Sequence, residues 1–163
     1  MIKLQGGTVI GLTSSKEKAK ITTLAGADHV FLYTEAWHMK VLEMTNGTGV
    51  NVVYESVGST LGESFNATKI GGTVVFYGMA GGNPAPVDPR MLMDTSKTLT
   101  GGDLWNVLTT YEERKKRSTQ LFDWIATGKL NISNPTTFSL QDGALAHELL
   151  ESRKSTGKIL LIP

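Results

Sequence analysis

Apolar residues along this chain gather in short continuous runs that are bounded by glycine and polar turn residues. The run Thr73–Tyr77 (TVVFY) is the strongest and directly follows the pair Gly71-Gly72. A continuous apolar run of this length is typical of a strand buried on both faces of a parallel sheet. The pattern predicts strands at Thr8–Leu12, Asp28–Tyr33, Val50–Tyr54, Thr73–Tyr77, Lys97–Gly101 and Lys158–Ile162.

The segments between these runs carry helix start and stop signals. Ser14-Ser-Lys-Glu17 matches the capping-box pattern, which predicts a helix start. That helix is expected to run to about Ala25, because Gly26 follows. A longer amphipathic helix is predicted over Thr110–Thr127, with Leu121, Phe122, Trp124 and Ile125 facing inward. Further helices are predicted at Glu35–Thr45, Leu61–Ile70 and Asp142–Glu151, with a short helical turn at Met91–Asp94.

Alternation of apolar strands with helices indicates the fold class. Such a pattern favours an α/β fold with a doubly wound parallel sheet, which is Rossmann-like. We expect one partial dinucleotide-binding domain over residues 1–163. Residues 1–117 would hold the nucleotide-fold strands and helices, and residues 118–163 a C-terminal helical tail with the last strand.

Composition narrows the function classes. Apolar residues make up 40% and charged residues 19% of the 163 residues, which is typical of a globular protein. The net charge of +1 gives no general attraction to nucleic acid or to a membrane surface, and no apolar run reaches membrane-spanning length. Cysteine is absent and the three histidines are far apart, so no metal site is expected. Without a signal-peptide pattern, a cytoplasmic location is expected.

The end of the second strand of a nucleotide fold contacts the adenosine ribose, and an acid there favours NAD over NADP. In this chain the strand end reads Gly11-Leu-Thr-Ser-Ser-Lys16, with Lys18 next and no carboxylate before Glu17. A helix N-terminus adds free N–H groups that favour an anion. The pattern favours NADP, while the alternative is that Ser14 and Glu17 only cap a helix and the lysines face solvent.

Five stretches carry a resemblance to a known family: VIGLTSSKEKAK, AGADHVFLY, TNGTGVNVVYESVG, IGGTVVFYG and AHELLESRKSTGKILLIP. In this order and at this spacing, the chain resembles the C-terminal, cofactor-binding part of the zinc-independent quinone oxidoreductases. These proteins belong to the medium-chain dehydrogenase/reductase superfamily, together with zeta-crystallin. The resemblance covers the whole chain.

The resemblance implies a set of cofactor-binding residues. Lys18 and Tyr33 match the pair that binds the 2′-phosphate of NADPH, with Ser14 nearby. The other implied residues are Ser56, Val57 and Gly58 near the ribose and nicotinamide, Tyr77 and Gly78 beside the nicotinamide, and Arg153 reaching from the tail. Catalytic residues are not implied.

Simpler structural interpretations of these residues stay open. Tyr33 could be packing at a strand end, Ser56-Val-Gly58 could be an ordinary turn, and Glu55 could be a structural cap partner. The family often has Phe-Gly-Asn where this chain has Tyr77-Gly78-Met79, and Met79 cannot supply the amide.

No Gly-x-Gly-x-x-Gly follows a strand and precedes a helix in this chain. By resemblance, the first strand of the fold, its glycine loop and the substrate-side domain are missing, and the chain starts inside the following helix. The missing strand is central, between Thr8–Leu12 and Val50–Tyr54. We expect Lys158–Ile162 to fill that place, with a strand from a second chain or direct closure as alternatives.

The resemblance implies an NADPH-dependent oxidoreductase that transfers hydride to a quinone or an α,β-unsaturated carbonyl. Little turnover is expected from this chain alone, because the substrate side is missing. Alternatives are an enoyl reductase domain of a larger synthase, or a non-catalytic module that binds NADP or dimerises. A homodimer is expected through Lys97–Gly101, since this strand is the sheet edge in the resembled family.

Overall fold

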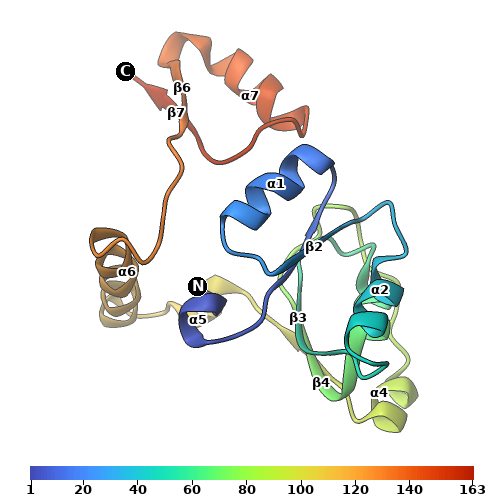
Figure 1. Cartoon of the computed structure of the whole chain (residues 1–163). Coiled ribbons are helices and arrows are strands. Elements are labelled where there is room, and N and C mark those ends of the chain that lie inside the picture. Colours follow the sequence, from blue (N-terminus) through green and yellow to red (C-terminus); the bar gives the residue numbers. More distant parts are fainter. The chain divides into compact units, whose positions relative to one another are not determined.

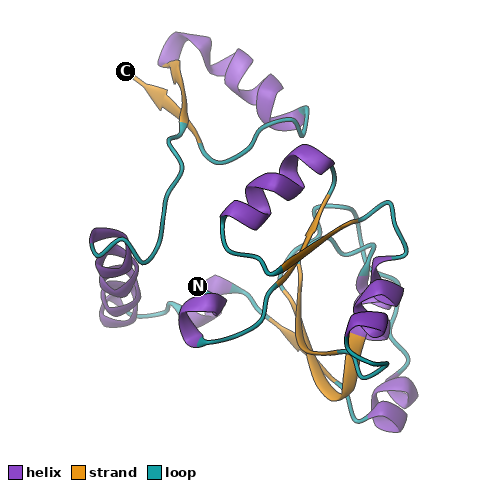
Figure 2. Ribbon diagram, in the orientation of Figure 1, coloured by secondary structure: helices purple, strands orange, loops and turns teal.

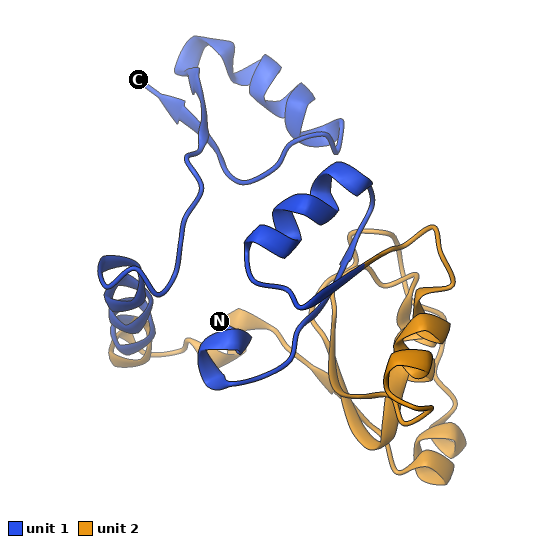
Figure 3. Cartoon of the chain, in the orientation of Figure 1, with its two compact units in different colours: residues 1–30, 115–163 blue, residues 31–114 orange.

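The computed structural model describes all residues, 1–163, and divides into two compact units. Unit 1 comprises residues 1–30 and 115–163, and unit 2 comprises residues 31–114 (Figure 3). Figures 1 and 2 show helices and strands alternating along the chain. No helix is both long and apolar enough to cross a membrane.

A parallel sheet forms the centre of unit 2. Its strands are β3 (Val50–Glu55), β4 (Thr68–Phe76) and β5 (Thr98–Gly101), in the order β3-β4-β5. The register pairs Glu55 with Phe76 and Phe76 with Gly101, so all three strands end at one level. The segments that follow the strands therefore begin side by side at the carboxyl edge of the sheet.

Apolar packing between this sheet and its helices forms the core of unit 2. Leu61 and Phe65 of α3 (Leu61–Ala67) pack with Val74 of β4, and all three are buried. They lie on one helical face because their spacing of four residues is close to one turn. Partly buried residues of the neighbouring elements complete the cluster: Val53, Phe76, Val87, Leu99, and Met91 and Leu92 of α4 (Pro89–Thr95).

Trp37 anchors α2 (Trp37–Met44) in unit 2, at 2% exposure. Its indole Nε1 donates to Glu63 Oε2 of α3 at 3.1 Å, which satisfies the polar end of the buried ring. The remaining short helix of this unit is α5 (Leu104–Val107), and the sequence pattern did not predict it.

The boundary between α3 and β4 differs from the prediction. The helix ends at Ala67, three residues before the predicted Ile70, and β4 starts at Thr68, five before Thr73. The register jumps between Val50–Thr68 and Val52–Thr73, so the strand carries a bulge at the Gly71-Gly72 pair. Gly71 has φ +71°, a backbone conformation that glycine adopts without a steric penalty.

The N-terminal part of unit 1 contains a 3-10 helix (Ile2–Gln5), β1 (Ile10–Thr13) and α1 (Lys16–Leu24). β1 forms a two-stranded sheet with β2 (His29–Leu32). Asp28 ties this region together, because its carboxylate accepts from Lys3 Nζ at 2.8 Å and from the Val9 N–H at 2.7 Å.

The C-terminal part of unit 1 is a β-α-β unit. β6 (Thr136–Ser139) is followed by a 3-10 turn (Leu140–Asp142), α7 (Gly143–Glu151) and β7 (Ile159–Ile162). The strands are parallel, from Thr136 opposite Ile159 to Ser139 opposite Ile162. The prediction that Lys158–Ile162 inserts between the strands at Thr8–Leu12 and Val50–Tyr54 is therefore wrong. Strand β7 pairs instead with β6, which is nearer in the chain, and closing a shorter loop costs less entropy. The sequence pattern did not predict β6 because this strand is short and polar.

One predicted helix face is also partly wrong. The helix α6 (Tyr111–Ala126) forms as expected, and Leu121, Trp124 and Ile125 are half-buried. Phe122, predicted to face inward, is 67% exposed. Consecutive helical residues point about 100° apart, so Leu121 and Phe122 cannot both lie at the centre of one face.

The α/β class with parallel strands alternating with helices is confirmed. The prediction of one partial domain with a division after residue 117 is not tested by this arrangement and stays a prediction.

Candidate functional site

A pocket of about 340 Å³ in unit 1 brings together three of the predicted cofactor residues, Ser14, Lys18 and Arg153. Ser14 and Lys18 come from the start of α1, and Arg153 follows the end of α7. The rest of the lining is Ser15, Glu17, Lys154 and Thr156. The pocket thus holds three cationic side chains, one carboxylate and three hydroxyls, a composition that suits an anion.

Lys18 and Arg153 are in direct contact. The Lys18 Nζ donates to the Arg153 carbonyl oxygen at 2.6 Å. Arg153 has φ +59°, although the position after a helix end that takes this conformation is usually glycine. A side chain there costs roughly 1–2 kcal/mol. Non-glycine residues in this conformation are enriched at functional sites.

The start of α1 corrects the predicted capping box. Ser15, rather than Ser14, is the N-cap, and its side chain accepts from the Lys18 N–H at 3.3 Å. Glu17 therefore falls one position before the place a capping box requires. Because Ser15 caps the helix, the Ser14 hydroxyl is not needed for capping and lies in the pocket lining.

The carboxyl edge of the unit 2 sheet brings together five further predicted residues. Ser56, Val57 and Gly58 follow β3, while Tyr77 and Gly78 follow β4. The Tyr77 N–H donates to the Glu55 carbonyl at 3.0 Å, which extends the pairing of the two strands by one bond. A Cβ on Gly78 would lie 2.9 Å from the Ser56 carbonyl, so glycine allows the close approach.

The two loops that follow these strands are bonded to each other. The Ala80 N–H donates to the Ser56 carbonyl at 3.1 Å, and the Gly81 N–H donates to the Val57 carbonyl at 2.7 Å. Gly58 is buried, has φ +87°, and a Cβ there would lie 2.1 Å from the Gly82 carbonyl. Gly58 is therefore a close-packing position, whereas Ser56 and Val57 are half-buried.

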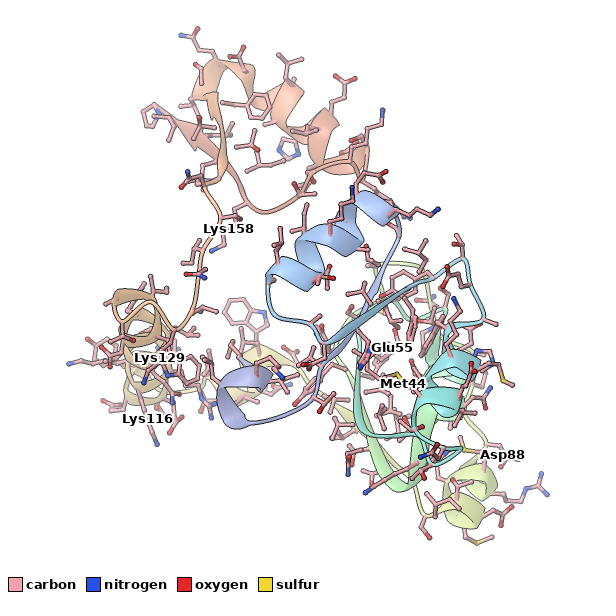
Figure 4. The ribbon with its side chains drawn as sticks, in the orientation of Figure 1. Met44, Glu55, Asp88, Lys116, Lys129 and Lys158 are labelled. Carbon is pink, nitrogen blue, oxygen red and sulfur yellow. The ribbon has the colours of Figure 1, made fainter.

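Glu55 organises the first of these loops and was not among the predicted cofactor residues. It is 3% exposed, and its Oε1 accepts from the N–H groups of Val57 at 2.7 Å and Gly58 at 3.0 Å. The hydroxyls of Thr60 and Ser64 also donate to this carboxylate. The structural interpretation of Glu55 as a cap partner is the one these contacts support (Glu55 is labelled in Figure 4).

The electrostatics of Glu55 follow from these bonds. Burial alone would raise the pKa of its carboxyl, but the hydrogen bonds from Ser64, Gly58, Val57 and Thr60 outweigh burial and hold the pKa below its usual value. Glu55 is therefore a carboxylate at neutral pH. The acid directly after a strand in VVYESVG was the available signal, and the donors Thr60 and Ser64 follow at the start of the next helix.

Tyr33, the last predicted residue, lies in unit 2 directly after β2. Burial raises the pKa of its phenol, and the nearby charge of Glu55 and then Tyr77 raise it further. Its pairing with Lys18, which belongs to unit 1, stays a prediction.

A larger cavity, of about 400 Å³, lies in unit 2 between α3 and α4 and contains none of the predicted residues. Leu61, Phe65 and Met91 give it a largely apolar wall. Its one lysine, Lys97, donates to the Phe65 carbonyl at 2.7 Å at the end of α3. Nowhere in the chain do three or more His, Asp or Glu side chains gather where a metal ion could bind.

Comparison with known proteins gives consistent matches. The family model described as "Zinc-binding dehydrogenase" matches residues 25–161. A 2-haloacrylate reductase of a Burkholderia species is 35% identical over 97% of this chain and 49% of its own length. A quinone oxidoreductase of Salmonella typhimurium is 37% identical over 99% of this chain and 51% of its own length.

A solved structure agrees with these relatives. The quinone oxidoreductase of Escherichia coli, solved in complex with NADPH, matches with a TM-score of 0.92 and 34% identity. The match covers 99% of this chain and 51% of that one. The chain thus spans about half the length of the curated relatives it matches.

Proposed function

Because the chain belongs to the quinone oxidoreductase family of the medium-chain dehydrogenase/reductase superfamily and corresponds to its C-terminal, NAD(P)-binding half, we propose that it binds NADPH for hydride transfer to a quinone or an α,β-unsaturated carbonyl. NADPH, when bound, supplies the hydride. A conjugated acceptor is supported by the name of the Burkholderia relative, a 2-haloacrylate reductase.

The single observation that carries the proposal is the cationic pocket at the start of α1. Lys18, Arg153 and Lys154 outnumber the one carboxylate, Glu17, and the Ser14 hydroxyl lies among them. A 2′-phosphate needs both charge and hydrogen-bond donors, and the N-terminal end of a helix favours an anion. Tyr33 is proposed as a further contact to this group.

The other end of the cofactor is assigned to the carboxyl edge of the unit 2 sheet. In an open α/β sheet, ligands bind outside the carboxyl ends of the strands. The backbone groups of Val57 already hold the loops, because its N–H donates to Glu55 and its carbonyl accepts from Gly81. The Ser56 and Val57 side chains and the Tyr77-Gly78 segment are therefore the groups that would orient the ribose and nicotinamide.

A fragment-binding experiment tests the phosphate assignment. We expect Lys18→Ala to weaken 2′,5′-ADP binding roughly ten- to hundredfold in calorimetry, since a hydrogen bond to a charged group contributes about 1.5–3 kcal/mol. Binding of 5′-AMP, which lacks the 2′-phosphate, should change little. Lys20→Ala is the matched control, because Lys20 is an exposed lysine of the same helix outside the pocket. Equal losses for the two ligands would contradict the assignment.

The electron acceptor and the assembly are also proposals. Relatives of twice this length have a second half, so we expect this chain alone to turn over slowly. A homodimer is proposed through β5, which pairs with β4 on one side only and is an edge of the unit 2 sheet. An unpaired edge offers a row of backbone groups to a second copy.

A further inference from the structure

Glu55 is a buried carboxylate whose hydrogen-bond donors all follow it closely in the chain. Two backbone N–H groups and two hydroxyls donate to one carboxylate, and none of the ion pairs in the structure includes it. All of its donors are therefore neutral groups of the following loop and of α3. A buried charge held only by neutral donors fixes the positions of those donors strongly, because releasing any one of them leaves the charge less compensated.

The contacts continue from the first loop to the second. Val57 donates its N–H to Glu55 and accepts from Gly81 with its carbonyl, so its peptide groups link the carboxylate to the second loop. The Gly58 N–H also donates to Glu55, and the Gly58 Cα lies close to the Gly82 carbonyl of the second loop. The order of contacts is thus Glu55, then the loop at 56–58, then the loop at 78–82.

We propose that Glu55 is a positioning residue that holds these two loops together in the shape that accepts the nicotinamide side of the cofactor. Glu55 does not contact the cofactor in this proposal, and it acts through Val57 and Gly58. The assignment of the nicotinamide to this edge rests on the proposed function. The coupling between the two loops does not depend on it.

Three variants of the full chain separate positioning from charge. Glu55→Ala removes the acceptor and leaves its donors without a partner. Glu55→Gln removes the charge but keeps the contacts: its amide oxygen can accept from the two N–H groups, while its amide nitrogen donates to the Thr60 and Ser64 hydroxyls, which reverses those two hydrogen bonds. Ser64→Ala removes one donor with almost no change in volume. Glu63→Ala is the matched control, since Glu63 is also a hydrogen-bonded carboxylate of this unit but lies outside both loops.

Ligand binding gives the first measurement. We expect Glu55→Ala to weaken NADPH binding about tenfold or more, followed by nicotinamide fluorescence, while 2′,5′-ADP binding stays unchanged. Glu55→Gln should restore NADPH binding. Equal weakening of both ligands, or no change in either, would overturn the proposal. If Glu55→Ala does not fold, Ser64→Ala decides, with a two- to threefold selective loss supporting the proposal and no loss rejecting it.

Amide hydrogen exchange gives a second measurement that needs no ligand. Glu55→Ala, or Ser64→Ala if the former is unfolded, should speed exchange at Val57 and Gly58 and also at Ala80 and Gly81, which Glu55 does not touch. Glu63→Ala should leave all four amides unchanged. Faster exchange confined to Val57 and Gly58 would reject the coupling. Wild-type chain that binds neither NADPH nor 2′,5′-ADP would instead reject the proposed function, and the exchange result would still decide the coupling.

Discussion

Gly58→Ala provides a severe test of how closely the two loops must approach. Gly58 has φ +87°, and a side chain in this region of backbone conformation costs roughly 1–2 kcal/mol. The added Cβ would lie 2.1 Å from the Gly82 carbonyl, which is 1.3 Å inside the 3.4 Å at which ordinary contact begins. Because the obstacle is backbone, no side-chain rotation can relieve it.

The second loop must therefore move away, and its bonds to the first loop break. Two bonds join the loops, from the Gly81 N–H to the Val57 carbonyl at 2.7 Å and from the Ala80 N–H to the Ser56 carbonyl at 3.1 Å. A typical hydrogen bond contributes about 0.5–1.5 kcal/mol. The loss of both bonds and the backbone cost together give an expected loss of about 2–5 kcal/mol, a large share of the stability of an ordinary domain.

Urea unfolding measures this loss, with the fluorescence of Trp37 as the probe for unit 2. The chain has three tryptophans, so Trp105→Phe and Trp124→Phe provide a background in which only the buried Trp37 reports. Gly62→Ala is the matched control, because Gly62 lies in α3 with no atom within 4 Å of an added Cβ. It should stabilise the chain by about 0.5–1 kcal/mol. Equal unfolding midpoints for Gly58→Ala and wild type, or equal losses for both glycine variants, would refute the reasoning.

Three further predictions follow from the same features. The pKa of Glu55 is lower in the folded chain than in the unfolded chain, so its contribution to stability is present above the usual glutamate pKa, near 4.3, and is lost as pH falls through the folded value. The urea midpoint should therefore fall less steeply from pH 7 to pH 3 in Glu55→Gln than in the wild type, and parallel curves would contradict this. Leu99→Pro and Thr100→Pro each remove one backbone N–H of β5, and the two N–H groups point to opposite edges of the strand. If β5 forms the dimer, light scattering should show the variant that loses the outer N–H as a folded monomer. A wild-type chain that stays monomeric at high concentration would exclude this dimer. NADPH oxidation by this chain with a quinone acceptor should be far slower than the roughly 10 per second of a typical enzyme and unchanged by a chelator; full turnover, or loss of activity with the chelator, would count against the proposal.

The sequence alone determined the elements whose signals are local. Apolar runs located β3, β5 and β7 to within a residue at each end, and helix signals located α2, α6 and α7 to within two. Parallel pairing then follows, because a helix between two strands returns the chain to the end of the sheet where the first strand began. The two strands then run in the same direction, and their carboxyl ends lie at one edge. The grouping of Ser56 with Tyr77 as cofactor residues came from the family resemblance, and the parallel sheet places the two segments that hold them at one edge.

The tertiary structure decided what depends on partners that are distant in sequence. Strand β7 pairs with the short polar β6, which carries too little apolar character to be recognised as a strand. The contact of Lys18 with the Arg153 carbonyl joins two helix ends that no local pattern relates. The role of Glu55 as the common acceptor of several hydrogen bonds depends on the packing of α3, which brings the Ser64 hydroxyl to the end of β3. Hydrophobic periodicity specifies which face of an element is buried, whereas the particular donor that meets a buried charge is fixed only by the packing of the whole unit.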